Sequence, residues 1–201
     1  MIDYIFDFIF ILNNFVSTYY FSSLIIYFLF SIVFFSFSLP GGLIVLLGSG
    51  FFFGFLNGFL INIISISLGS LIFIIFTNTI FKKLFSKFYK KYYQKFSHHI
   101  SNSSYEYLIL IRLIIGFPLI FQNLCISFLD ISKVRIFITS LVGFSPIMFI
   151  FSYTGHQVSN IIELREFTVS KVISIEFLLF LFFLIVIFLF KIFFKKKIKP
   201  F

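Results

Sequence analysis

Tryptophan is absent from this 201-residue chain, proline occurs only four times and cysteine only once. The lone Cys125 excludes an internal disulfide bond and any metal site that is built from cysteines. The three histidines are too few and too scattered to form a set of metal ligands, and no Ser/His/Asp or paired-carboxylate arrangement is recognisable. We therefore expect no metal, no cofactor and no enzyme activity.

Charge is scarce as well. Charged residues make up 11% of the chain, against about 25% in soluble domains, whereas hydrophobic residues make up 60%. The 38 Phe and 10 Tyr side chains exceed what a water-soluble fold of this length can bury. These values predict an integral membrane protein, and the length of the apolar runs predicts that it is all-α.

Four apolar stretches approach the roughly 20 residues that a helix needs to cross the hydrocarbon core. They are residues 19–39, 62–81, 134–154 and 172–194. The N-terminal segment is different, because Asp3, Asp7 and Asn14 fall on one stripe of an otherwise apolar helix. This pattern predicts an interfacial N-terminal helix over residues 1–18.

Most of the basic residues lie in two blocks beside hydrophobic runs, at residues 82–95 and 191–199. The formal net charge is +9, but such blocks are typical of cytoplasmic loops, and we expect no nucleic-acid partner. The first block interleaves lysines with aromatic residues, which suits contact with membrane lipids that carry anionic headgroups. If both blocks are cytoplasmic, an even number of crossings separates them, and we expect both chain termini to be cytoplasmic.

Residues 105–131 do not fit a simple span under that count. Arg112, at the centre of a lipid-facing helix, would cost about 2.5–3.5 kcal/mol on insertion scales. In the stretch RLIIGFPLIFQN, Gly116 and Pro118 then break the helix. Two arms of roughly ten residues remain, each about half as long as the hydrocarbon is thick. The segment is therefore predicted to be a re-entrant hairpin.

The stretch LPGGLIVLLGSGFFFGFLNGFL predicts a second break, because Pro40 and Gly41 begin it. Its later glycines recur every four residues, at Gly50, Gly54 and Gly58. At that spacing they would form one smooth helical face for close packing. We interpret residues 40–61 as a hairpin from the opposite leaflet. The predicted fold has about four transmembrane helices plus two opposed re-entrant helical hairpins in an inverted repeat.

These motifs resemble the DedA/VTT-domain membrane family, also called the SNARE-associated Golgi protein family, over roughly residues 36–158. In the first half, the Pro-Gly entry and Phe53-Gly54 match the family pattern. In the second half, the matching residues are Arg112, Pro118, Asn123, Phe137, Gly143, Pro146 and Gly155. No acidic residue occurs between Asp7 and Glu106, where the DedA branch has acids, so the VTT branch is the closer match.

The resemblance implies opposed re-entrant hairpins, no known cofactor, and movement of lipids or of a lipid-linked phosphate between leaflets. We expect an interfacial helix at residues 1–18, a VTT-like membrane domain at 19–158, and a transmembrane helix with a basic tail at 159–201. The expected location is the bacterial inner (plasma) membrane. A homo-oligomer is left open.

Arg112 is the residue to which we assign substrate binding, because a guanidinium stays charged and its fork of donors suits a phosphate. Gln122 and Asn123 lie on the returning arm and are expected to satisfy freed backbone groups or to bind the headgroup. For Arg112, a structural ion pair with Glu106 or Asp130 is the alternative.

The other candidate residues are expected to shape the hairpins and their packing. They are Pro40, Gly41, Gly50, Gly54, Gly58, Gly116, Pro118, Gly143 and Pro146. The resulting hypothesis is a transporter-like protein that moves phospholipid or a lipid-linked phosphate through a groove between the hairpins. Two alternatives stay open: a small-solute or ion transporter of the same architecture, and a non-transporting membrane scaffold.

Overall fold

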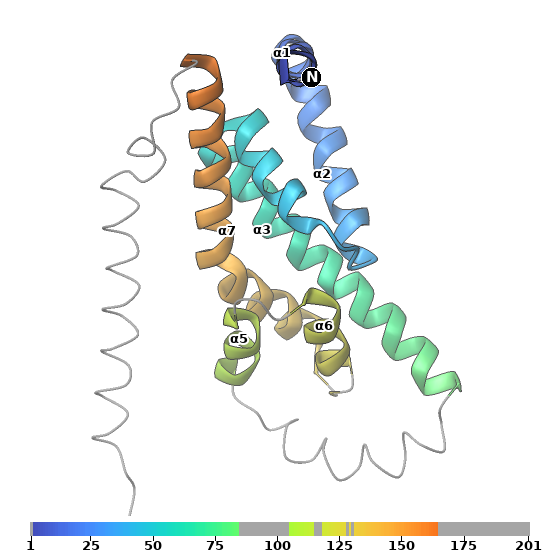
Figure 1. Cartoon of the computed structure of the whole chain (residues 1–201). Coiled ribbons are helices and arrows are strands. Elements are labelled where there is room, and N and C mark those ends of the chain that lie inside the picture. Colours follow the sequence, from blue (N-terminus) through green and yellow to red (C-terminus); the bar gives the residue numbers. More distant parts are fainter. Residues whose placement is uncertain (1, 85–104, 115–117, 128, 130, 165–201) are drawn as a thin grey trace, which may run out of the picture. The chain divides into compact units, whose positions relative to one another are not determined.

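The computed structural model describes residues 2–84, 105–114, 118–127, 129 and 131–164 (Figure 1). Every regular element in these ranges is a helix, as the sequence predicts. The lysine block beyond residue 84, the predicted span at 172–194 and the basic tail lie outside the described residues. The chain divides into two compact units, Met1–His156 and Gln157–Phe201, and the contacts discussed below lie within the first.

The N-terminal segment forms a helix of its own, α1 (Ile2–Thr18), which is followed by α2 (Tyr20–Ser36). Residues Ile9–Thr18 of α1 and the whole of α2 meet at an angle of 111°. This bend separates α1 from α2, as expected for an N-terminal helix that does not continue into the next one. Its position at the membrane interface stays a prediction.

Helix α3 (Gly42–Leu84) is sharply bent at Gly54, where φ is 76° and ψ is 172°. Only glycine adopts this backbone conformation readily, because in any other residue the Cβ atom would crowd the adjoining peptide groups of its own backbone. The bend divides α3 into a short arm, residues 42–53, and a long arm, residues 55–84. It folds the two arms together so closely that a Cβ atom added to Gly58 would lie 2.7 Å from the Cα atom of Gly50.

Two details of the predicted first hairpin are therefore wrong. The glycines at 50, 54 and 58 do not form one helical face, because the helix breaks at the middle one. Residues 40–61 are also not a separate unit before a span at 62–81, since the helix continues from the bend to Leu84. The physical reason is that no proline and no positive-φ residue interrupts the long arm after Gly54.

Helix α2 is the partner of the short arm, because the Tyr27 hydroxyl donates a hydrogen bond of 2.6 Å to the Val45 carbonyl. Helix α2 also runs parallel to the long arm. Near the start of both, Asn57 Nδ2 donates to the Tyr20 hydroxyl over 2.6 Å. Near the end of α2, Phe35 packs closely on Gly69. A Cβ atom added to Gly69 would lie 2.6 Å from the Cβ atom of Phe35. Helix α2 thus ends beside the middle of the long arm.

The second half of the described chain holds two short helices, α5 (Tyr105–Leu113) and α6 (Leu119–Ser127), and the long α7 (Lys133–Leu164). Helix α7 runs antiparallel to the long arm of α3. Asn62 near the start of that arm donates to Ser152 Oγ over 2.9 Å, while Ile74 further along packs with Ile136 near the start of α7.

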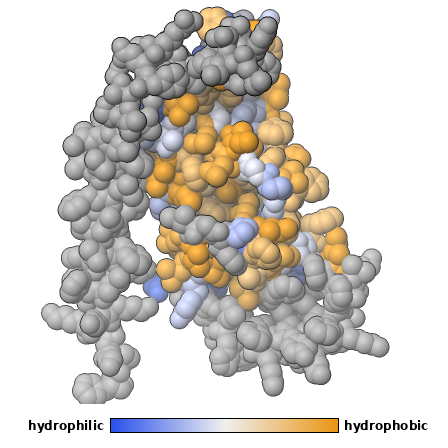
Figure 2. Space-filling model, viewed as in Figure 1, coloured by the Kyte–Doolittle hydropathy of each residue, from blue (hydrophilic) through white to orange (hydrophobic). Residues whose placement is uncertain are grey.

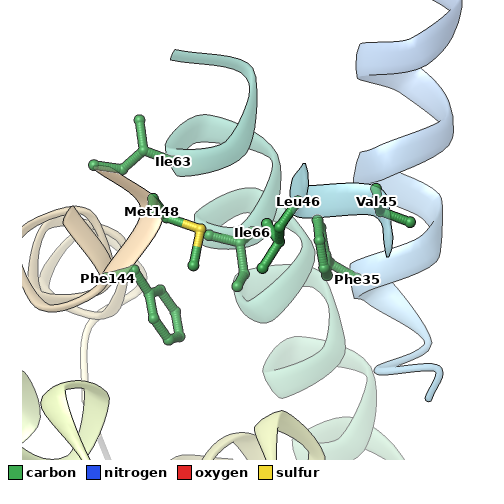
Figure 3. Packing of buried hydrophobic residues seen from close by; sticks show 7 residues of the cluster. All are labelled: Phe35, Val45, Leu46, Ile63, Ile66, Phe144 and Met148. Atoms are coloured by element: carbon green, nitrogen blue, oxygen red, sulfur yellow. The ribbon is translucent and has the colours of Figure 1, made fainter. Parts of the chain in front are cut away.

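The buried side chains form two hydrophobic clusters. The first joins α2, both arms of α3 and α7, and contains Phe35, Val45, Leu46, Ile63, Ile66, Phe144 and Met148 (Figure 3). The second joins the long arm with α5, α6 and α7, and contains Ile74, Leu108, Ile126, Leu129 and Ile136.

The outer surface is also apolar, and hydrophobic residues cover much of the coloured face in Figure 2. Phe21 and Ile44 are 79% and 78% exposed, which water would not favour. Residues Gly42–Ile80 and Lys133–Asn160 are long and apolar enough to cross a membrane. The bent pair of α1 and α2 adds a third candidate if it counts as one span. The chain is therefore an integral membrane protein.

Candidate functional site

Arg112 lies in the last turn of α5 and is only 2% exposed. Its Nη1 donates a hydrogen bond of 2.7 Å to the Oδ1 atom of Asn123, which is fully buried in α6. The hydrogen bond joins the two short helices on either side of the Gly116–Pro118 break. A charge that is expensive to bury is thus held at the place where the chain is interrupted.

Helix α7 packs against Arg112 through two neighbouring residues, Gly143 and Phe144. The Cβ and Cγ atoms of the arginine pack against Gly143, at a place that a Cβ atom on the glycine would occupy. The guanidinium carbon lies 4.8 Å from the centre of the Phe144 ring, a cation–π arrangement. Gly143 therefore gives the arginine stem its space, and Phe144 stacks against its charged end.

Asn123 extends this network to the first half of the chain, since its Nδ2 donates to Ser38 Oγ over 3.2 Å. Ser38 lies in the turn between α2 and the short arm of α3, and its φ of 49° is in the left-handed region. Residues 85 positions apart are thereby joined. The turn after α2 and the second broken segment meet at one buried polar point.

Two of the three guanidinium nitrogens of Arg112 have no hydrogen-bond partner among the residues that the structure describes. Within the described residues, its buried Nε and Nη2 atoms make no hydrogen bond. These two nitrogens form one edge of the guanidinium, the edge that binds a carboxylate or phosphate in a bidentate manner. Because an unpaired buried donor is costly, an anion on this edge would stabilise the site.

The ion pair considered as an alternative for Arg112 is not found in the described part of the chain. Glu106, at the start of α5, is exposed and makes no ion pair with it. Asp130 and Gly116 lie outside the described residues. Gln122 is buried in α6 beside Asn123, where the sequence placed both on the returning arm. Their roles toward a headgroup stay predictions.

The prolines of the second half are accommodated locally. Pro118 stands directly before α6, and its carbonyl accepts from the backbone nitrogens of Phe121 and Gln122 at 3.0 and 3.2 Å. Pro146 lies inside α7, where its missing N–H frees the Val142 carbonyl. The Ser145 hydroxyl donates to that carbonyl over 2.9 Å, so the helix continues.

In the first half, Gly41 has a φ of +92° and supplies the tight turn after Pro40. Gly50 packs on the Ser152 backbone, and Gly155 packs on the Leu47 backbone. At these two contacts the backbones of α7 and of the short arm touch each other directly. Glycine is needed at both positions, because any side chain would push the helices apart.

Sequence reasoning missed Ser38 and Phe144 as parts of the site. Neither residue is unusual for its segment, since serine and phenylalanine occur throughout the chain. Only the approach of α7 and the α2 turn to Arg112 distinguishes them. Among the described residues, no group of three His, Cys, Asp or Glu side chains could hold a metal ion.

A family model, the VTT domain, matches residues 39–157 of the chain. This protein belongs to the VTT domain family. The match confirms the family that the motifs around Arg112 predicted, and it makes the chain a membrane protein of the DedA kind. No curated protein and no solved structure matches the chain.

The VTT domain contains nearly the whole network described above. Arg112, Asn123, Gly143 and Phe144 all lie within the matched residues, and Ser38 directly precedes them. The domain also begins at the turn after α2 and ends near the end of α7. The polar point at which its two halves meet is therefore a feature of the domain itself.

Proposed function

We propose that this VTT domain moves a phosphate-bearing lipid between leaflets, and that Arg112 holds the phosphate on the way. The observation that carries the proposal is the unpaired Nε and Nη2 edge of a guanidinium that is 2% exposed. Intramembrane charge is in general a mark of function. No chemical step is needed, because the protein only replaces the hydration of the headgroup.

The arrangement of the helices supports a site near the membrane midplane. If the long arm of α3 crosses the bilayer, α2 ends beside Gly69, near the middle of that arm. The nine residues of α5 and of α6 each extend about 14 Å, roughly half the hydrocarbon thickness. The turn at Ser38 and the facing ends of α5 and α6 would then lie at half depth, where Asn123 joins them.

We therefore revise the first hairpin: α2 and the short arm enter from one leaflet, while α5 and α6 enter from the other. Each hairpin is followed by one long helix, the long arm in the first half and α7 in the second. This arrangement has the form of an inverted repeat, which in transporters places the substrate at the interface of the two repeats. It gives three crossings instead of four when the predicted span at 172–194 is included.

Arg112 is enclosed, so a lipid phosphate reaches it only when the two hairpins separate. The hydrogen bonds that hold the turn of the first hairpin against the second are those of Asn123, which lies between Ser38 and Arg112, and Leu119 of α6 adds apolar packing. In this proposal, separation toward one leaflet and then the other carries the headgroup past the guanidinium while the acyl chains stay in the lipid. The described structure is the closed state.

The test is reconstitution of the full chain in phosphatidylcholine liposomes with a fluorescent phospholipid or a fluorescent lipid phosphate. Dithionite then reports how fast inner-leaflet lipid becomes accessible. We expect the wild type to move at least one of the two lipids and Arg112→Ala to slow this by tenfold or more, in line with loss of a charged hydrogen-bonding group. Arg135→Ala is the matched control, since Arg135 stacks on Tyr105 at 4.7 Å without binding Asn123.

Two results would overturn the proposal. Equal rates for wild type and empty liposomes with both lipids would exclude lipid movement. A wild-type rate for Arg112→Ala would remove Arg112 from the path. In the first case, flux of small ions or solutes in the same vesicles separates the transporter alternative from a scaffold.

A further inference from the structure

The two hydrophobic clusters are separated by a layer of polar side chains. On the long arm of α3, Ile66 belongs to the first cluster and Ile74 to the second, and Ser70 lies one helical turn from each. On α7, Phe144 and Ile136 stand in the same relation to Ser140. Because these two helices run antiparallel, Ser70 and Ser140 lie at the same level between the clusters.

The two short helices contribute to the same layer. Leu108 of α5 and Ile126 of α6 belong to the second cluster. One turn further toward the first cluster, α5 carries Arg112 and α6 carries Gln122. The contact of Arg112 with Phe144 places its guanidinium about one helical turn from Ser140 along α7. Four helices thus place a buried polar side chain in one layer, and Arg112 is its charged member.

The two serines of this layer differ from four other buried serines in how their hydroxyls are used. Serine in a helix usually donates to a carbonyl three or four residues earlier. Here Ser31, Ser49, Ser65 and Ser127 do so, with distances of 2.8, 2.8, 3.3 and 2.7 Å. Ser70 and Ser140, which are fully buried, have no hydrogen-bond partner among the described residues.

Ser67 and Ser23 have the same property; Ser67 lies one turn before Ser70 on the long arm, whereas Ser23 lies in α2, outside the layer. Three hydroxyls and two guanidinium nitrogens that have no partner in the described part of the chain therefore fall at or next to one level of the fold. Native structures leave few buried polar atoms unsatisfied, and such a group calls for an explanation. Hydrogen-bond donors without partners beside a positive charge would favour the binding of an anion, because the anion accepts their hydrogen bonds and offsets the charge.

We propose that Ser70 and Ser140 are anion-binding residues, which complete with Arg112 a buried seat for a tetrahedral phosphate group. The Nε and Nη2 edge of Arg112 binds two phosphate oxygens, and the two hydroxyls donate to the remaining ones. This inference rests on the proposed function, because it assigns further residues to the same site. The group is the phosphate of a lipid headgroup or free phosphate, which share this chemistry.

The experiment measures anion binding to the purified full chain in phosphatidylcholine nanodiscs. One arm adds inorganic phosphate, and the other incorporates phosphatidic acid, so that the two sources are distinguished. We expect Ser70→Ala and Ser140→Ala each to weaken binding on the order of tenfold, the scale of one hydrogen bond to a charged group. Ser49→Ala is the matched control, since its buried hydroxyl is already bonded to the Leu46 carbonyl.

A thermal melt without ligand separates binding from structure. Loss of an unpaired hydroxyl removes no hydrogen bond, so Ser70→Ala and Ser140→Ala should melt at or above the wild-type temperature. Weaker anion binding together with unchanged or higher stability supports the seat. A lower melting temperature with unchanged affinity overturns it, because the serines would then be structural.

The remaining outcomes distinguish this inference from the proposed function. If Arg112→Ala abolishes binding and both serine variants bind like wild type, the serine assignment is overturned while Arg112 keeps its role. If the wild type binds neither inorganic phosphate nor phosphatidic acid, the seat is overturned, and the lipid assay described above decides the proposed function by itself.

Discussion

Arg112 and Asn123 are joined across the second hairpin by a hydrogen bond of 2.7 Å between Nη1 and Oδ1, and both side chains are buried. Asn123 is the one hydrogen-bond partner of Arg112 in the described residues. The amide carries no charge, so it positions the guanidinium without neutralising it. An aspartate at this place would do both.

The first prediction follows from that difference. Asn123→Asp should keep or raise the stability of the folded chain, because a carboxylate pairs with the buried guanidinium. It should also weaken phosphate binding by tenfold or more, because the same carboxylate competes for Arg112. Asn123→Ala should instead lower the free energy of unfolding by about 1–3 kcal/mol, the cost of an unsatisfied buried group. Unfolding in mixed micelles and anion titration check both, and tight anion binding by Asn123→Asp would contradict the prediction.

The second prediction concerns Gly143, which gives space to the stem of Arg112. Gly143→Ala places a methyl group where the Arg112 Cβ atom lies, so the guanidinium must shift. We expect lipid movement to fall in the dithionite assay, since a displacement of about 1 Å is costly at a binding site. Gly42→Ala is the control, because its nearest neighbour is the Phe35 ring edge at 3.3 Å, far from Arg112 in the chain. Equal loss in both variants would point to a general packing effect.

The third prediction tests the bend in α3. Gly54 has positive φ and an extended ψ, a region that other residues adopt only under strain. Gly54→Ala should therefore lower the free energy of unfolding by roughly 1–3 kcal/mol. No atom lies within 4 Å of the added Cβ, so the loss reports backbone strain and not a clash. Gly54→Asn should cost about as much as Gly54→Ala, because this region, unlike the left-handed helical one, is essentially restricted to glycine, and wild-type stability of either variant would argue against this cause.

The fourth prediction concerns membrane orientation. Because α2 runs parallel to the long arm and ends beside its middle, the N-terminal helix and Leu84 should face opposite sides of the membrane. If the lysine-rich block after Leu84 is cytoplasmic, the N-terminus is not, contrary to the sequence-based expectation for both termini. A cysteine introduced near residue 2 and one near residue 90, in a Cys125→Ala background, should react with an impermeant reagent from opposite sides. Reaction of both from one side would restore the original crossing count.

The composition and the motifs predicted the class of protein and the family correctly, for physical reasons that need no tertiary contacts. Too little charge and too many phenylalanines for a soluble core leave only the membrane as solvent. The helix boundaries near Pro40 and Pro118 were also predictable, because proline cannot continue a helix in the usual way. Arg112 and Asn123 stood out because polar groups are rare in such segments.

The pairing of the segments was not predictable in this way. The four-residue spacing of Gly50, Gly54 and Gly58 is compatible with one helical face and also with a bend at the middle glycine. Only the approach of the flanking backbones decides between them, and it selected the bend. The partner of the short arm is α2 for the same reason, since hydrogen bonding and packing of distant segments set it.

By itself, the sequence determined that this chain is a helical membrane protein of the VTT domain family with a buried arginine at a broken segment. The tertiary structure decided which groups surround that arginine. Ser38 and Phe144 lie far from Arg112 in the chain and carry no local signal, because serine and phenylalanine are common throughout it. Phe144 contacts Arg112 directly and Ser38 is joined to it through Asn123, because distant helices pack in one register, and register depends on contacts between helices and not on the spacing within any one of them.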